Sequence, residues 1–305
     1  MENWEERALE QAKENYRYYP QVYGIGFGSK FSGGARLANV QSIQFFVARK
    51  IADEDLAKPL PRFVYARHPD GTLDRDRAIA TDVIETGTIE LCCAAGDRVS
   101  RHGADGCTTL IFRNKTADAR LLMLTCSHVV GDDLSVTPQP VTLLGGTQAC
   151  EFQASVISNT VLKQGRLEFD MALAEISAHD PDLTELAVAD TGIVLDGFLG
   201  NGGFAAGSGL DCVSPESGRR LITVESISTE FRNVNAAGGL QISVGNLIAC
   251  KGEAVEGDSG GIVFSGSKAG GIVVARGSEG WVFIHPLQNA VSHLAAVAGM
   301  QLTCF

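Results

Sequence analysis

The chain opens with one helical pattern, which is followed by short apolar runs between turn residues. Good helix formers with apolar positions at fourfold spacing predict a helix over residues 5–17, which should end before Pro20. Strands are predicted over residues 22–27, 40–49 and 77–85. Residues 51–56 predict a short helix, so residues 1–88 together are expected to form a small α+β domain.

From about residue 89 the pattern changes to short apolar runs that are separated by glycine-rich turns. Strands are predicted first over residues 108–112, 121–124, 141–144, 151–157 and 171–176, and then over residues 194–200, 220–226, 240–244, 261–264, 271–274 and 281–284. Residues 286–297 place apolar side chains on one stripe and predict a closing helix. The chain is therefore expected to be mostly β, with 35 glycines available for its turns.

Composition narrows the classes of function. The 305 residues are 45% hydrophobic, which is enough apolar surface for one large or two smaller domains. The formal net charge of −11 disfavours binding to nucleic acid or to an anionic membrane. The acidic start of the chain lacks the features of a secretory signal, and no window is long and apolar enough to span a bilayer. A cytoplasmic location is therefore expected.

The eight cysteines are expected to be reduced thiols. They are Cys92, Cys93, Cys107, Cys126, Cys150, Cys212, Cys250 and Cys304. A cytosolic chain keeps its thiols reduced, and no two cysteines have the Cys-x-x-Cys spacing that is typical of a zinc site. Most of them are predicted to be small buried apolar residues. Neither a metal nor a cofactor is expected.

The glycine-rich segment at residues 257–261 carries the strongest chemical signal of the chain. It places Ser259 among glycines that allow a sharp turn, which would aim the N–H groups of Gly257 and Ser259 at one oxyanion. A serine hydroxyl also needs a neighbouring base. His128 follows an apolar run and Asp170 precedes another, which predicts that strands position both side chains.

Taken singly, each of these three residues has a commoner explanation: a core or surface histidine, a strand-capping aspartate and a turn serine. Together they occur in the order His128, Asp170, Ser259, which is the order of chymotrypsin-type triads. The Gly-x-Ser-x-Gly pattern also fits an α/β-hydrolase, but that fold needs a helix after the serine and places the histidine last. A serine–histidine–aspartate triad is therefore predicted.

Three segments resemble the motifs of the trypsin/chymotrypsin family of serine endopeptidases. Residues 125–128 (Thr-Cys-Ser-His) resemble the family's Thr-Ala-Ala-His, and residues 170–173 (Asp-Met-Ala-Leu) resemble Asp-Ile-Ala-Leu. Residues 257–261 match the family's serine motif. More narrowly, the chain is similar to the bacterial and plant intracellular branch, in which a small extra domain precedes the protease. The resemblance implies hydrolysis of peptide bonds through an acyl-enzyme.

The resemblance also implies an architecture. Residues 89–305 would form a chymotrypsin-like double β-barrel, with the first barrel at about residues 89–190 and the second at about residues 191–285. A C-terminal helix would follow at about residues 286–297. The histidine and the aspartate would lie on the first barrel and the serine on the second. The leading domain would either cover the protease or dock a regulatory partner, since relatives act in stress or defence systems.

Substrate preference is expected from residues that the resemblance places at the primary pocket. Glu253, six residues before the serine, would lie at its base and favour Lys or Arg before the cleaved bond; the alternative is a solvated loop glutamate. Val274 and Arg276 would form the opposite wall. Arg276 either pairs with Glu253 or attracts an acidic side chain. Val274 lacks the hydroxyl that supports the catalytic aspartate in relatives.

Activation and function each leave alternatives open. In secreted relatives the carboxylate at the position of Asp258 pairs with a new N-terminus that cleavage creates, because a buried charge needs a partner. Here either an internal basic residue serves Asp258, or cleavage or a partner completes the site, with Arg219 and Arg220 as a candidate cleavage point. An esterase that uses the same triad and a catalytically silent binding protein are the alternative functions.

Overall fold

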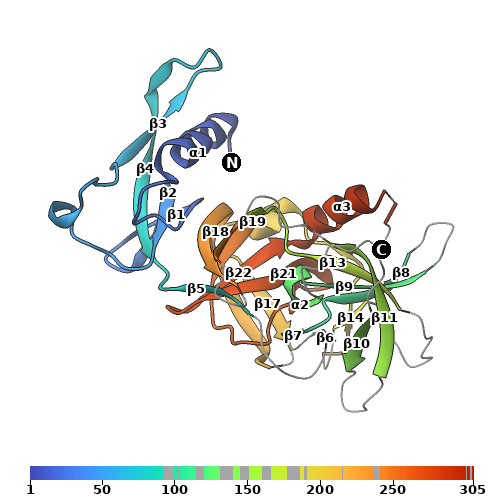
Figure 1. Cartoon of the computed structure of the whole chain (residues 1–305). Coiled ribbons are helices and arrows are strands. Elements are labelled where there is room, and N and C mark those ends of the chain that lie inside the picture. The colour runs from blue at the N-terminus through green and yellow to red at the C-terminus, as the bar shows by residue number, and fades with distance from the viewer. Residues whose placement is uncertain are drawn as a thin grey trace.

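Strands make up most of the structure, which is a computed structural model (Figure 1). It describes residues 1–92, 99–101, 104–114, 120–130, 140–144, 151–159, 166–176, 186–188, 191–214, 216–236, 241–299, 301–302 and 304–305. The prediction of a mostly β chain that ends in a helix is confirmed. Cys93 and Cys150 lie outside the described residues.

The leading part begins with helix α1 (Asn3–Tyr16), two residues before the predicted start. The carboxylate of Glu5 accepts a hydrogen bond of 2.6 Å from the N–H of Glu2, which satisfies one of the backbone donors that a helix start leaves unpaired. The helix turns one face toward the strands, and that face buries Ala8, Leu9 and Ala12. Apolar spacing alone therefore located this helix correctly.

Four strands follow α1 in the leading part. They are β1 (Gly24–Ser32), β2 (Ala35–Val47), β3 (Phe63–Arg67) and β4 (Leu73–Glu85), in the spatial order β1-β2-β4-β3. A single 3₁₀ turn at Asp53–Asp55 stands where a short helix was predicted. Strand β3 was not predicted; along it, exposed Phe63 and Tyr65 alternate with buried Val64 and Ala66.

The leading strands continue the largest sheet of the molecule. Strand β1 pairs antiparallel with β18 (Gly218–Asn235), with Gly24 opposite Phe231. Glycine is needed at this contact, because a Cβ on Gly24 would lie 2.3 Å from the Phe231 ring. Strand β18 runs far beyond the predicted residues 220–226, and its polar-looking second half pairs with both β1 and β19.

The sheet that contains β1 to β4 has 13 strands, and a second sheet has seven. The other strands of the large sheet are β5 (Ile89–Leu91), β12 (Arg166–Leu167), β16 (Gly197–Phe198), β17 (Gly209–Ser214), β18, β19 (Gln241–Lys251), β20 (Ile262–Ser265), β21 (Lys268–Gly277) and β22 (Trp281–Pro286). The seven-stranded sheet has the order β7 (Ala104–Gly106), β6 (Val99–Arg101), β10 (Pro140–Leu144), β11 (Glu151–Asn159), β13 (Ala172–Ile176), β9 (Leu121–Thr125) and β8 (Leu110–Arg113). Smaller elements are β14 (Ala187–Val188), β15 (Ile193–Val194), a 3₁₀ helix at Asn201–Phe204 and the one-turn helix α2 (Ser127–Val130).

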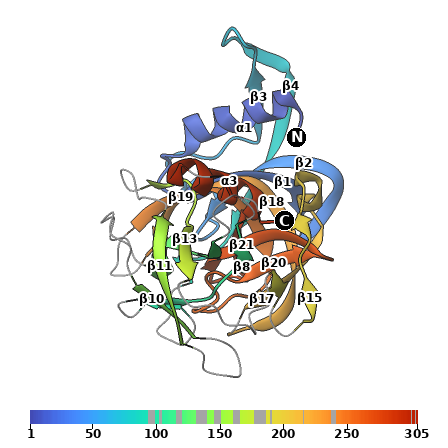
Figure 2. The same ribbon diagram turned by 90° about the vertical axis from the view of Figure 1, so that its right-hand side faces the viewer.

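One apolar core joins the two sheets. It contains Leu122 and Leu173 from the smaller sheet and Phe231 and Phe283 from the larger one. Helix α3 (Leu287–Ala298) packs on this core and ends at Gly299 in the left-handed region, with a φ of 63°. In Figures 1 and 2, β3 and β4, at one end of the large sheet, project from the rest of the molecule. None of the helices in the described part of the chain is both long and apolar enough to cross a bilayer.

Candidate active site

His128 and Asp170 reach the same end of the smaller sheet from two neighbouring strands. Strands β9 and β13 pair antiparallel, with Thr125 opposite Ala172. His128 follows β9 in helix α2, and Asp170 precedes β13, so the antiparallel pairing brings the two residues together. Ser259 lies in the loop between β19 and β20 of the larger sheet. The three residues predicted from the motifs therefore meet where the two sheets adjoin.

The side chains of these three residues form a hydrogen-bonded chain. His128 Nε2 lies 2.7 Å from Ser259 Oγ, and His128 Nδ1 forms a short hydrogen bond with Asp170 Oδ2. The backbone N–H of His128 also donates to Asp170 Oδ1 at 3.0 Å, which fixes the carboxylate relative to the ring. A carboxylate on Nδ1 favours the tautomer with the proton there, which leaves the Nε2 lone pair facing the hydroxyl.

Asp170 is fully buried, and its charge is balanced locally. Burial acts to raise the pKa of this carboxyl group, but the charge of His128 and the hydrogen bonds from His128 outweigh burial, and the pKa is lowered. The group therefore stays ionised at neutral pH beside the imidazole. An ionised Asp170 is suited to orient the ring and to stabilise its cationic form.

His285 supports Asp170 from behind, a role that the sequence did not reveal. The N–H of Asp170 donates to His285 Nε2 at 2.9 Å, so this nitrogen must be the acceptor, and His285 Nδ1 faces the carbonyl of Asn246 at 3.3 Å. Burial lowers the pKa of His285 to about 4, which keeps the ring neutral. His285 lies in β22 directly after four buried apolar residues, 281–284, and this apolar run was the available signal.

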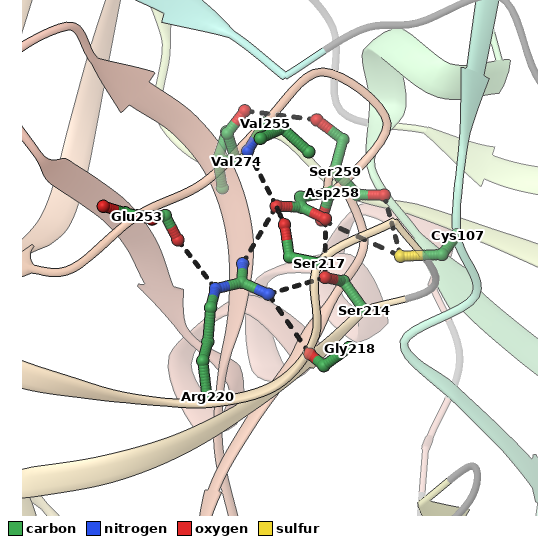
Figure 3. Close-up of polar contacts among 10 residues, drawn as sticks. All are labelled: Cys107, Ser214, Ser217, Gly218, Arg220, Glu253, Val255, Asp258, Ser259 and Val274. Atoms are coloured by element: carbon green, nitrogen blue, oxygen red, sulfur yellow. Dashed lines mark hydrogen bonds and ion pairs between the residues drawn. The ribbon is translucent and has the colours of Figure 1, made fainter.

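The loop that carries Ser259 is held by the buried carboxylate of Asp258 (Figure 3). The hydroxyls of Ser214 and Ser217 each donate to it at 2.6 Å, and the N–H of Val255 donates at 2.8 Å. Arg220 Nη2 completes the set at 3.0 Å from Oδ2. An internal basic residue therefore pairs with Asp258. Of the two residues named as a candidate cleavage point, Arg220 is 14% exposed and engaged in this pair, whereas Arg219 is 52% exposed.

Two backbone features fix Ser259 itself. Gly260 has a φ of +90°, and a Cβ at this position would lie 1.8 Å from the carbonyl oxygen of Cys107. The N–H of Cys107 donates to the carbonyl of Ser259 at 2.6 Å. Only glycine fits after the serine, because the backbone between β7 and β8 approaches it this closely.

The two predicted oxyanion donors differ in what they contact. The N–H of Gly257 donates to the carbonyl of Cys92 at 3.2 Å. The N–H of Ser259 donates to no acceptor among the described residues. One of the two donors thus already binds a backbone carbonyl of the same chain.

The residues predicted to set specificity are not gathered in one pocket wall. The side chain of Glu253 is exposed, and its backbone carbonyl accepts a hydrogen bond of 2.7 Å from Arg220 Nε. Arg276 pairs at 3.3 Å with Glu90 of the same chain, a partner that neither of the two alternatives for Arg276 had named. The side chain of Val274 is buried, and its carbonyl oxygen lies 3.3 Å from Ser259 Oγ.

Cys126 lies beside the triad residues without the chemistry of a metal ligand. Its sulfur, an imidazole nitrogen of His128 and a carboxylate oxygen of Asp170 lie within 4.8 Å of one another. Burial raises the pKa of the Cys126 thiol well above its usual value, and the thiol donates to the carbonyl of Val273 at 3.2 Å. The six cysteines that the structure describes are all buried.

Comparison with known proteins gives a likeness of fold. No family model matches the chain, and no curated protein matches it. A protease of Nocardiopsis is 15% identical, with 66% of this chain and 95% of that chain covered and a TM-score of 0.44. Protease A of Thermobifida fusca is 20% identical (70% and 98% covered, TM-score 0.43). The chymotrypsin of Cellulomonas bogoriensis is 16% identical (70% and 98% covered, TM-score 0.41). By itself, a likeness at these TM-scores identifies no function.

Proposed function

We propose that the protein is a serine endopeptidase that cleaves protein substrates through an acyl-enzyme. The observation that supports this most directly is the chain of contacts from Asp170 through His128 to Ser259, with 2.7 Å between the ring nitrogen and the hydroxyl. This distance lies within the reach that proton transfer requires. The same contacts would serve an esterase, so the experiment below compares the two substrates.

The proposed mechanism assigns one role to each side chain. Ser259 Oγ attacks the substrate carbonyl carbon while His128 Nε2 takes its proton. The carbon–nitrogen bond then breaks, and His128 gives the proton to the leaving amine. Water attacks the acyl-enzyme with His128 again as the base, which releases the new carboxylate and restores Ser259. Asp170 holds the ring in its tautomer and stabilises the imidazolium in both halves of the reaction.

The N–H groups of Gly257 and Ser259 are proposed to bind the oxyanion. The Arg220–Asp258 pair holds the loop that carries these donors, so the donors need no reorganisation during the reaction. Loss of one oxyanion donor typically lowers turnover about 100- to 1,000-fold. The carbonyl of Cys92 at Gly257 supports a second candidate, a protease whose site opens only when a partner or a substrate displaces that carbonyl.

Substrate choice, partners and location stay predictions. The predicted preference for Lys or Arg before the cleaved bond rests on Glu253, whose side chain is exposed. A regulatory partner at the leading part and a role in a bacterial stress or defence system come from the resemblance alone. Peptides that differ only in the residue before the cleaved bond test the first of these predictions.

The proposal is tested by hydrolysis of an unstructured protein, casein, and of a small ester, p-nitrophenyl acetate. We expect the wild type to cleave both, Ser259→Ala to cleave neither above background, and Asp170→Asn to lose about 10,000-fold in turnover. Ser292→Ala, an exposed serine on α3, is the matched control and should retain full activity. Ester hydrolysis without casein cleavage would favour the esterase, and casein cleavage that survives Ser259→Ala would contradict the proposal.

A further inference from the structure

The chain that leaves the leading part runs directly into the candidate active site. Strand β5 (Ile89–Leu91) lies antiparallel to β21, with Glu90 opposite Arg276 and Leu91 opposite Ala275. The N–H of the next residue, Cys92, donates to the carbonyl of Val274 at 3.1 Å. An extended peptide that binds a protein by adding a strand to a sheet makes the same kind of ladder. Residues 89–92 therefore have the conformation of a bound peptide.

The ladder ends with the carbonyl of Cys92 at a proposed oxyanion donor. Gly257 N–H donates to this carbonyl at 3.2 Å. The carbonyl oxygen of Val274, which binds the Cys92 amide, also lies 3.3 Å from Ser259 Oγ. Cys92 is thus bound on both sides by groups next to the nucleophile. A carbonyl held by an oxyanion donor is in the place where a substrate carbonyl reacts.

Burial agrees with an occupied site. Ser259 has 0% exposed surface, and the side chain of His128 is 7% exposed. Cys92 and Ile89 of the bound segment are buried to a similar degree, at 0% and 1% exposed. A protease must present its nucleophile to external substrates, so a nucleophile with no exposed surface requires a covering segment to move.

One ion pair joins a side chain of the bound segment to a side chain of β21. Arg276 Nη2 lies 3.3 Å from a carboxylate oxygen of Glu90, which stands two residues before the carbonyl at Gly257. Arg276 lies on β21, the strand that would hold a substrate, and it contacts a side chain of the occupant. The side chains of Glu90 and Arg276 are 44% and 32% exposed, so the pair is accessible to exchange.

We propose that residues 89–92 occupy the substrate site of their own molecule in the manner of a substrate. The carbonyl of Cys92 takes the place of the carbonyl that is attacked, and Arg276 holds the side chain of Glu90. The segment keeps the enzyme closed in cis, and its sequence identifies the substrates accepted in trans: peptides with an acidic residue two positions before a small apolar one, which replaces the Lys or Arg that Glu253 had suggested at that position. This inference rests on the proposed protease function and adds its substrate class and its regulation.

The test is the rate at which a fluorophosphonate labels Ser259 in the full chain. Glu90→Arg and Arg276→Glu each replace an exposed attraction by a repulsion, so each should label about two- to fivefold faster than the wild type. The double variant restores the attraction with the charges exchanged and should label at the wild-type rate. Cys92→Pro removes the N–H that binds Val274 and should raise the rate on the order of tenfold.

Glu54→Arg is the matched control, because it makes the same charge change at an exposed position of the leading part. It should label at the wild-type rate, and the thermal melt of every variant is measured to establish that it is folded. A wild type that labels at Ser259 as fast as Cys92→Pro and both single variants would overturn this inference and leave the protease function intact. Failure of every folded variant to label would overturn both.

Substrate preference supplies a second readout in the Cys92→Pro background. The probes are acetyl-Ile-Glu-Leu-Ala-p-nitroanilide and the same peptide with Arg in place of Glu, with Ala standing in for the cysteine. The glutamate peptide should have a kcat/KM about two- to fivefold higher, and Arg276→Glu should reverse that order. Equal kcat/KM values for the two peptides, or an order that Arg276→Glu does not reverse, would overturn the assignment of Arg276.

Discussion

Arg220 offers a sharp test of how the nucleophile loop is held. The carboxylate of Asp258 is fully buried, and Arg220 is the cation that pairs with it among the described residues. Replacement by methionine keeps the apolar stem and removes the charge. Breaking one side of a buried ion pair costs about 3–5 kcal/mol, because the remaining charge is left uncompensated.

The value for Arg220→Met should lie at the lower end of this range. Three neutral donors, the hydroxyls of Ser214 and Ser217 and the N–H of Val255, stay on the carboxylate. Arg220 is also 14% exposed, so water reaches part of the pair. We expect a loss of about 3 kcal/mol, which corresponds to a fall of roughly 6 °C in Tm for a chain of this size. Activity should fall with it, because the oxyanion donors lie on the same loop.

The assay is thermal unfolding followed by casein hydrolysis at a temperature where every variant is folded. Arg219→Met is the matched control: Arg219 pairs with Asp211 at 2.9 Å on the surface, and its loss should cost less than about 1 kcal/mol. Arg220→Met combined with Asp258→Asn leaves no buried charge at this position and should recover most of the stability. An Arg220→Met protein that melts and hydrolyses like the wild type would refute the reasoning and point to another cation at Asp258, such as a new N-terminus made by cleavage.

Two further predictions concern the surroundings of the nucleophile. Gly260→Ala places a Cβ 1.8 Å from the carbonyl oxygen of Cys107, so it should lower the free energy of unfolding by about 3 kcal/mol or more and reduce activity. Gly266→Ala, at φ +58° with no atom within 4 Å of the new Cβ, should lower it by only about 1–2 kcal/mol. Equal melting temperatures for the two variants would contradict this prediction. The pKa of His285 is lowered from 6.5 to about 4, so the unfolded chain binds a proton that the folded protein does not, and stability should fall as pH drops from about 6.5 to about 4. The loss in the free energy of unfolding over this pH range should total roughly 3 kcal/mol. Urea unfolding at several pH values measures it: His285→Gln should lose this pH dependence, and His68→Gln should keep it.

The candidate residues could be found in the sequence because each lies in a strong local pattern. His128 follows a continuous apolar strand, Asp170 precedes another, and Ser259 stands in a glycine-rich turn. Helix α1 and helix α3 were predicted to within a few residues for the same reason, since their apolar spacing is local. Local chemistry of this kind needs no knowledge of what packs against it.

The features that the sequence did not reveal depend on distant parts of the chain. The second half of β18 pairs with β19 and with β1, which lies about 200 residues earlier. The support that His285 gives to Asp170 spans 115 positions, and the placement of Cys92 at Gly257 needs the fold to bring the two loops together. The pairing of Arg276 with Glu90 was not predicted for the same reason, because the two residues lie 186 positions apart and only the fold places β5 beside β21.

The most direct test of the account is to map the adduct of a fluorophosphonate on the full chain by peptide mass spectrometry, after labelling to completion. We predict a single adduct on Ser259 that is formed by the wild type, absent in Ser259→Ala and at least about 100-fold slower in His128→Ala. An adduct on another residue, or one that forms on Ser259 at the same rate without His128, would show that His128 does not activate this serine.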